Sequence, residues 1–289
     1  MTSEFSARFG SLTVRYISDD EPLVPGKHFQ PFLTDADAAL TVRISRPEAL
    51  STPQGMLLWE TPKERVYRDG KNETHVYSVP PPAALDYISV FGNADEGALT
   101  AELLRQIEIP AQSILLSNLE MERLLHRHRM TVLHASWVMY NEAALLFSGD
   151  SGVGKSTQAE LWHSVLGARI INGDKTGIAF PNGRATAVGM PFSGSSTYYE
   201  NATAPIRAIV MLSQAPENTI RRLTAPEAMR LLARQMPCQR WCAEDVTAVL
   251  EYAEQIATQV PVYRFACTKT AEAVTLLEQM LSAEDHHGT

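Results

Sequence analysis

The 289-residue sequence lacks the segments that mark membrane and secreted proteins. It has no apolar run near the ~20 residues that a transmembrane helix needs. Its first residues, MTSEFSARFGSL, contain no signal-peptide core. The three cysteines are an odd number without the spacing of a disulfide framework: Cys238, Cys242 and Cys267. We therefore expect a cytoplasmic protein with no membrane partner.

The sequence also lacks an excess of positive charge. Lys and Arg number 25 against 33 Asp and Glu, so the formal net charge is -8. A dedicated nucleic-acid-binding protein normally carries a basic stripe, so we expect no nucleic-acid partner. Cys238 and Cys242, four residues apart, would share one face of a helix. Two further zinc ligands are not evident beside them, which favours ordinary buried thiols.

Two regions of different character follow one another along the chain. Residues 1–115 are rich in short β-type runs, at 11–18, 39–46, 54–61 and 74–79, with a hairpin turn at 68–72. Residues 116–289 alternate strand and helix patterns, beginning with a helical stripe within 114–129. The sequence thus predicts an α/β fold with a strand-rich N-terminal region (1–115) and a second domain (116–289).

The second region contains the segment SGDSGVGKST, residues 148–157. It matches the phosphate-loop pattern Gly-x4-Gly-Lys-[Ser/Thr], the Walker A motif, between a predicted strand and a predicted helix. Glycines let backbone N–H groups point at phosphate oxygens, and the helix adds its positive N-terminal end. We expect the nucleotide to contact Gly149, Asp150, Ser151, Gly152, Val153, Gly154, Lys155, Ser156 and Thr157. Lys155 would neutralise the outer phosphates, and the Ser156 hydroxyl would bind Mg²⁺.

Two further polar residues are predicted to lie beside this loop. Asp174, in RIINGDK, follows the strand after the loop's helix. Its carboxylate is a candidate Mg²⁺ ligand, a candidate base toward an acceptor hydroxyl, or both; the alternative is an ordinary turn residue. His134 belongs to the strand before the loop-bearing strand. A histidine among apolar neighbours is more often an ordinary core residue. His134 is a candidate site residue because its strand is expected to end near the cleft that holds the phosphates and Asp174.

These residues together resemble a known family. His134 in a strand, then GDSGVGKST, then INGDK, and the closing VPVYRFACTKTAEAVTLLEQ are similar to the kinase domain of bacterial HPr kinase/phosphorylase and its smaller relatives. The resemblance covers residues 130–281. It implies the phosphoenolpyruvate-carboxykinase-like type of P-loop kinase core, with a mixed sheet. It also implies ATP and Mg²⁺ as cofactors, Asp174 as general base, His134 near the transferred phosphate, and assembly into a homo-oligomer.

The sequence departs from HPr kinase/phosphorylase in ways that bear on the substrate. The arginine-glycine segment tied to phosphorylase activity is not recognisable, and GMPFSGSSTYYEN, residues 189–201, stands in a comparable place. We therefore expect neither HPr as substrate nor phosphorylase activity. The small, hydroxyl-rich segment 189–201 would either close over an acceptor or a phosphate, or form a solvent-exposed loop.

The leading hypothesis is an ATP- and Mg²⁺-dependent kinase acting on an acceptor hydroxyl, with Asp174, His134 and Lys155 as the catalytic residues. Some relatives phosphorylate a peptide and others phosphorylate free serine. From the habits of the family we expect a peptide or protein acceptor, with a small metabolite as the alternative. A nucleotide-controlled ATPase or GTPase switch is the rival from another class. The Asp-x-x-Gly strand end and the base-specific element of GTPases are missing from the sequence, which favours the kinase.

Overall fold

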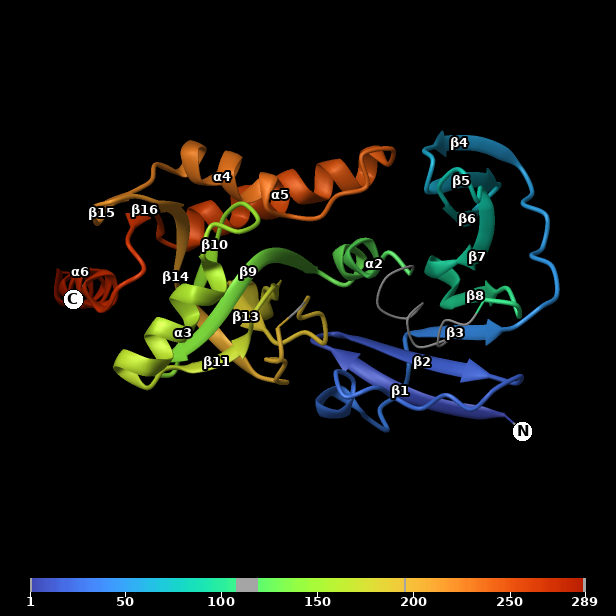
Figure 1. Ribbon diagram of the computed structural model, residues 1–289, viewed down its shortest axis with the longest axis horizontal. Helices are drawn as coiled ribbons and strands as arrows, with labels where there is room; N and C mark the ends of the chain where they lie inside the picture. Colours follow the sequence, from blue (N-terminus) through green and yellow to red (C-terminus); the bar gives the residue numbers. More distant parts are fainter. Residues whose placement is uncertain (1, 108–118, 195, 288–289) are drawn as a thin grey trace. The chain divides into compact units, whose positions relative to one another are not determined.

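The computed structural model describes residues 2–107, 119–194 and 196–287, and it divides the chain into two compact units (Figure 1). Unit 1 comprises Met1–His128 and unit 2 comprises Arg129–Thr289. The boundary predicted between residues 115 and 116 lies outside the described residues. The helix α2 (Met121–Arg127), which the sequence assigned to the second domain, belongs to unit 1.

Unit 1 is built on one eight-stranded mixed sheet with the order β1-β2-β3-β8-β7-β6-β5-β4. The pairs β2–β3 and β3–β8 are parallel, and the remaining neighbours are antiparallel. The strands are β1 (Ser3–Phe9), β2 (Leu12–Ser18), β3 (Leu40–Ser45), β4 (Met56–Glu60), β5 (Glu64–Asp69), β6 (Asn72–Val79), β7 (Leu85–Asn93) and β8 (Ala98–Leu103). Two 3-10 turns accompany them, η1 (Gln30–Phe32) and η2 (Ala94–Glu96).

The strand-rich character predicted for the N-terminal region agrees with this sheet. The four predicted β-type runs correspond to β2, β3, β4 and β6, and the predicted turn joins β5 to β6. The strands β1, β5, β7 and β8 were missed. β5 (ERVYRD) shows why: Val66 is its one buried residue, so its sequence carries little hydrophobic signal. Phe29 and Phe32 pack against aromatic side chains of β1 and β2, and together they form a cluster of Phe5, Phe9, Tyr16, Phe29 and Phe32.

Unit 2 contains a second mixed sheet, with the order β10-β9-β12-β13-β14-β16-β15. β11 pairs with β9, and β10 also pairs in parallel with β14. The strands are β9 (Met130–Tyr140), β10 (Ala143–Ser148), β11 (Arg169–Asn172), β12 (Lys175–Ala179), β13 (Thr186–Val188), β14 (Thr203–Gln214), β15 (Thr219–Arg222) and β16 (Val262–Cys267). A 3-10 turn, η3 (Pro181–Gly183), joins β12 to β13. The prediction of a mixed rather than parallel sheet is confirmed.

Helices cover both faces of this second sheet. α4 (Ala225–Arg234) and α5 (Ala243–Gln259) pack on one side, where Leu232 and Ile256 join a core with Trp137 of β9. α3 (Lys155–Leu166) and α6 (Ala271–His287) pack on the other side, where Trp162 and Leu277 join a second core with β10, β14 and β16. This helix–sheet–helix layering buries the sheet and leaves the strand ends and loops free to form a site.

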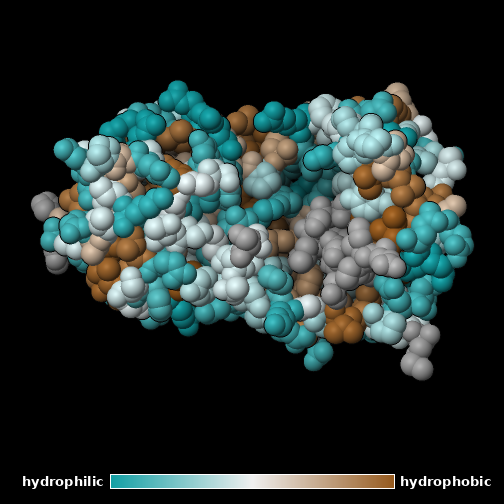
Figure 2. Space-filling view, viewed as in Figure 1, coloured by the Kyte–Doolittle hydropathy of each residue, from teal (hydrophilic) through white to brown (hydrophobic). Residues whose placement is uncertain are grey.

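Most of the surface visible in Figure 2 is hydrophilic, with hydrophobic residues in small separate groups. Among the described residues the exposed large hydrophobics include Met56, Leu57 and Trp59 of the edge strand β4. Within the described part of the chain, no helix combines the length and the apolar character that crossing a membrane requires.

Candidate functional site

The glycine-rich segment forms a loop between β10 and α3 of unit 2, as its sequence predicts. Gly149, Gly152 and Gly154 adopt φ values of 142°, 76° and 114°. A Cβ at Gly152 or Gly154 would meet no described atom within 4 Å, so the backbone conformation, and not crowding, requires glycine there. α3 begins directly after Gly154 and no side chain caps its first turn. Its first N–H groups therefore remain available to an anion.

Lys155 is turned back onto this loop. Its side chain is buried, and Nζ donates hydrogen bonds to Gly149 O at 3.0 Å and Asp150 O at 3.2 Å. Burial lowers the pKa of Lys155, and the carboxylates of Asp174 and Asp150 oppose this shift. The carbonyl oxygens are weak partners for a buried ammonium group, so an anionic ligand in the loop would compete for it effectively.

The other loop residues divide between those held by the fold and those open to solvent. Asp150 Oδ1 accepts a hydrogen bond from Gln235 Nε2 at 3.0 Å, and Gly152 O accepts one from Gln214 Nε2 at 3.1 Å. The Val153 side chain packs against the core of α3 and α6, so its backbone alone can serve a ligand. Ser151 is exposed and Thr157 is half-buried.

Asp174 and His134 meet beside the loop, as the sequence predicts. Asp174 directly precedes β12, whose first residue pairs with His134 of β9. His134 Nε2 lies 3.1 Å from Asp174 Oδ1, and about 30% of each side chain remains exposed (32% and 29%). The hydrogen bond from His134 lowers the pKa of Asp174; burial opposes the shift, and His134, Lys175 and Lys155 add to it through their charges. Asp174 is therefore an ionised carboxylate at neutral pH.

Ser156 lies close to this pair. Its Oγ donates to Gly173 O, the residue before Asp174, at 3.4 Å. Ser156 and Asp174 also line one cavity, so a hydroxyl and a carboxylate face the same space. Hard divalent cations such as Mg²⁺ take oxygen ligands of this kind. The two residues predicted to hold Mg²⁺ thus fit such an ion.

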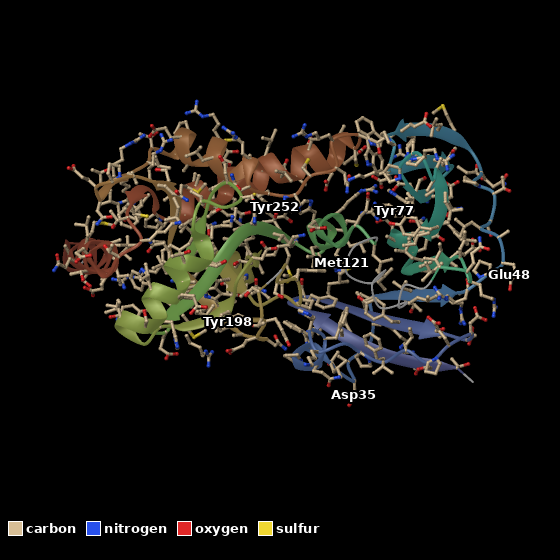
Figure 3. The ribbon with its side chains drawn as sticks, viewed as in Figure 1. Asp35, Glu48, Tyr77, Met121, Tyr198 and Tyr252 are labelled. Atoms are coloured by element: carbon tan, nitrogen blue, oxygen red, sulfur yellow. The ribbon has the colours of Figure 1, made fainter. Side chains whose placement is uncertain are left out.

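The cavity has a volume of about 290 Å³ and extends from α3 to the segment 189–201. Glu160 of α3 and Tyr198 are also on its wall, and Figure 3 shows Tyr198 beside α3 and β11. The segment approaches Asp174 closely: a Cβ at Gly194, where φ is 56°, would lie 2.9 Å from the carboxylate carbon. Described residues of this segment therefore line the cavity beside Asp174, and its closing over an acceptor or a phosphate stays a prediction.

Asn172 is a structural determinant of the site that the sequence interpretation missed. It is fully buried at the end of β11, and its Nδ2 donates to Met190 O at 2.8 Å and Phe192 O at 2.9 Å. Its Oδ1 accepts from the backbone N–H groups of Asp174 and Lys175, each at 2.9 Å. Asn172 therefore fixes both the turn that presents Asp174 and the start of the segment 189–201. The Asn-Gly-Asp sequence signals a turn but not these distant partners.

Replacing Asn172 by alanine is expected to lower the free energy of unfolding of unit 2 by at least ~2 kcal/mol, since it leaves buried carbonyl and N–H groups unpaired. Asn72, exposed in the β5–β6 hairpin, supplies the matched control, and Asn72→Ala should change the stability by under ~0.5 kcal/mol. Urea unfolding followed by tryptophan fluorescence measures both. Equal stabilities for the two variants would contradict the role given to Asn172.

Comparison with known proteins does not assign this chain to a family. No family model matches the chain, and no curated protein matches it. Among solved structures the chain is similar to the HPr(Ser) kinase/phosphatase from Coxiella burnetii, at 10% sequence identity over 55% of this chain and 97% of that chain, with a TM-score of 0.33. A TM-score of this size does not establish a shared fold.

Proposed function

We propose that this protein is an ATP- and Mg²⁺-dependent kinase that transfers the γ-phosphate to an acceptor hydroxyl, with a serine of a peptide or protein as the acceptor. One observation carries the proposal. The ionised carboxylate of Asp174, held by His134, shares a cavity with the Ser156 hydroxyl at the start of the phosphate loop's helix. A phosphate-binding loop and a carboxylate facing one space are the parts that phosphoryl transfer to an alcohol requires.

The nucleotide would be held by the loop 149–157. The positive-φ glycines and the uncapped start of α3 offer N–H groups, and Lys155 offers the charge that the outer phosphates need. Ser156 and Asp174 would hold Mg²⁺, which neutralises charge on the phosphates when bound. The fit rests on the donor set and on the open space around Gly152 and Gly154.

Asp174 would act on the acceptor. Transfer would form a bond between the acceptor oxygen and the γ-phosphorus and break the bond from that phosphorus to the bridging oxygen, so that ADP leaves. The hydroxyl proton must also leave, and Asp174 can accept it. The transition state of phosphoryl transfer is loose, and much of the base's contribution is to orient the hydroxyl. His134 keeps the carboxylate in one position through the 3.1 Å contact. Ser193, Ser196 and Tyr198 of the segment 189–201 would surround the acceptor group in the cavity.

The proposal is tested by supplying γ-labelled ATP and Mg²⁺ to the protein with a host lysate, divided into a polypeptide fraction and a small-metabolite fraction. Label in a polypeptide supports the full proposal. Label in a small molecule retains the kinase but replaces the acceptor class. Free phosphate alone in both fractions overturns the kinase and favours a nucleotide-controlled switch. Lys155→Ala, run in parallel, excludes label added by a contaminating kinase.

A further inference from the structure

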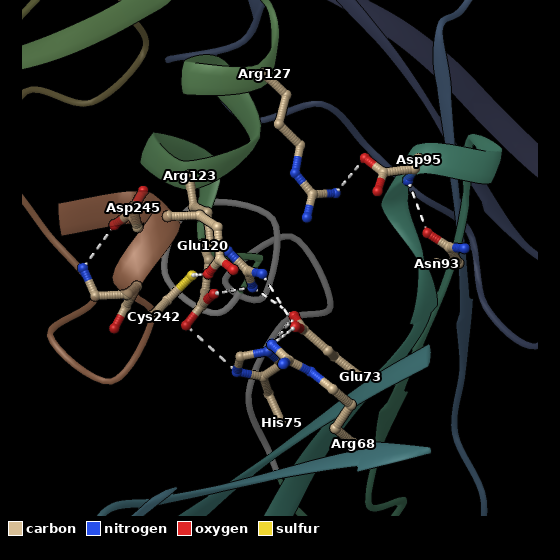
Figure 4. A network of polar contacts seen from close by, with 12 residues as sticks. Arg68, Glu73, His75, Asn93, Asp95, Glu120, Arg123, Arg127, Cys242 and Asp245 are labelled. Atoms are coloured by element: carbon tan, nitrogen blue, oxygen red, sulfur yellow. Dashed lines mark hydrogen bonds and ion pairs between the residues drawn. The ribbon is translucent and has the colours of Figure 1, made fainter. Parts of the chain in front are cut away.

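A buried polar network joins β5, β6 and the start of α2 in unit 1 (Figure 4). β5 and β6 pair so that Glu64 faces Tyr77 and Val66 faces His75. Glu64 is thus the diagonal neighbour of His75 on one face of the sheet. Glu120, at the N-cap of α2, meets them from the side of the helix. Figure 3 shows Tyr77 on β6 and Met121, the next residue after Glu120, on α2.

Three possible ligand atoms converge in this network. His75 Nδ1 lies 3.2 Å from Glu64 Oε1 and 3.3 Å from Glu120 Oε1, and all three atoms lie within 4.8 Å of one another. Zinc bonds to nitrogen and oxygen of 2.0–2.2 Å at tetrahedral angles separate neighbouring ligand atoms by about 3.3 Å. The spacing of the imidazole nitrogen from both carboxylates therefore suits one shared ion.

Glu120 supplies an independent indication of a missing partner. Its side chain is only 9% exposed, and its Oε1 accepts no hydrogen bond from a described residue; the 3.3 Å approach of His75 Nδ1, which Glu64 shares, is its polar contact. Burial raises the pKa of Glu120 to about 7, although the charges of His75 and Arg123 act in the opposite direction. A buried carboxylate oxygen without a hydrogen bond is costly, and a cation bound between Glu120, Glu64 and His75 would remove that cost.

The surrounding residues are arranged as outer partners of a metal site. The second ring nitrogen of His75, Nε2, lies 3.8 Å from Glu73 Oε2. Glu73 is fixed in turn by Arg68, at 2.8 Å, and by Arg123. Metal-ligating histidines commonly direct their free ring nitrogen at such a carboxylate, which orients the ring.

We propose that Glu64, His75 and Glu120 form a binding site for one divalent transition-metal ion, with Zn²⁺ as the representative. One imidazole nitrogen with two carboxylates favours such an ion over Mg²⁺ or Ca²⁺, which prefer oxygen ligands alone. The ion would fasten α2 to the β5–β6 hairpin and stabilise unit 1. The site is separate from the phosphate loop, which lies in unit 2, and does not depend on the proposed kinase activity.

The full chain, freed of metal by chelator and dialysis, is titrated with Zn²⁺ against a chromophoric chelator. We expect one Zn²⁺ per chain at this site and a rise in the melting temperature. Glu64→Gln and Glu120→Gln keep the side-chain shape but remove a charged ligand, and each should weaken binding at least about tenfold. The matched control is Glu102→Gln, a buried carboxylate of β8 paired with Ser51, which should bind Zn²⁺ as the unaltered chain does.

Co²⁺ substitution assigns the ligands independently of any variant. Nitrogen and oxygen ligation gives d–d absorption bands without the thiolate charge-transfer band that Cys238 or Cys242 would produce. A Co²⁺ spectrum that shows only a thiolate band overturns the proposal. Equal Zn²⁺ affinity in the unaltered chain and in a folded Glu64→Gln/Glu120→Gln variant also overturns it. If the double variant does not fold, the absence of Co²⁺ bands in the unaltered chain overturns it.

A titration in which the full chain takes up no Zn²⁺ overturns the proposal. Burial lowers the pKa of His75, but the neighbouring carboxylates of Glu64, Glu73 and Glu120 outweigh it and raise the pKa to about 9. A bound ion must displace the proton from His75 Nδ1, so Zn²⁺ uptake should release protons.

Discussion

Asp174→Asn is expected to lower kcat for phosphoryl transfer by roughly 10²–10⁴-fold while Mg²⁺-free ATP binding does not weaken. The amide cannot accept the proton of the acceptor hydroxyl, which accounts for the loss in rate. ATP binding without Mg²⁺ should be equal or tighter, since a negative charge beside the phosphates is removed. Steady-state kinetics on the identified acceptor and calorimetric titration with ATP measure the two effects.

Glu254→Gln, on an exposed position of α5, changes the net charge by the same amount and should keep full activity. A variant Asp174→Asn that transfers phosphate at the unaltered rate would contradict the role of Asp174. Loss of ATP binding in this variant would instead assign Asp174 to the structure of the loop.

The pH profile gives a second test of the same pair. The hydrogen bond from His134 lowers the pKa of Asp174, so the active carboxylate form persists to lower pH than for an ordinary aspartate. Activity should fall as the pH drops through this lowered pKa. In His134→Ala the pKa of Asp174 rises toward its usual value, so the acid limb of the profile should move to higher pH. An unmoved acid limb would contradict the contribution of His134.

Lys155→Ala has the second large expected effect. It should reduce kcat/KM for ATP by about 10²–10³-fold, because it removes a cation that stabilises charge on the transferred group. Stability should change little. The variant loses two hydrogen bonds, to Gly149 O and Asp150 O, but also loses the cost of burying an ammonium group.

Thermal unfolding and initial-rate kinetics separate these two effects. Lys269→Ala, at an exposed position before α6, is the matched control and should leave both measurements unchanged. Unaltered activity in Lys155→Ala would contradict the use of the loop for phosphate. A large drop in melting temperature would mean that Lys155 serves the apo fold rather than a ligand.

The glycine loop could be predicted because its signals are local. The motif, the apolar strand before it and the helix stopped at Gly167 are contiguous in sequence, and the structure has β10, the loop and α3 in that order. Asp174 and His134 were each expected near the loop, because one follows the strand after the loop's helix and the other lies in the strand before the loop-bearing strand; in the structure β9 pairs with both β10 and β12. Their 3.1 Å contact follows from that register.

What the sequence determined by itself is therefore the α/β character of the second region, its glycine-rich loop between a strand and a helix, and the two polar residues near it. Tertiary structure alone decided the role of Asn172, the approach of the segment 189–201 to Asp174, and the meeting of Glu120 with Glu64 and His75. The physical reason is distance along the chain. Propensities and turn signals act over a few residues, whereas these contacts depend on strand registers and helix packing that join segments tens of residues apart.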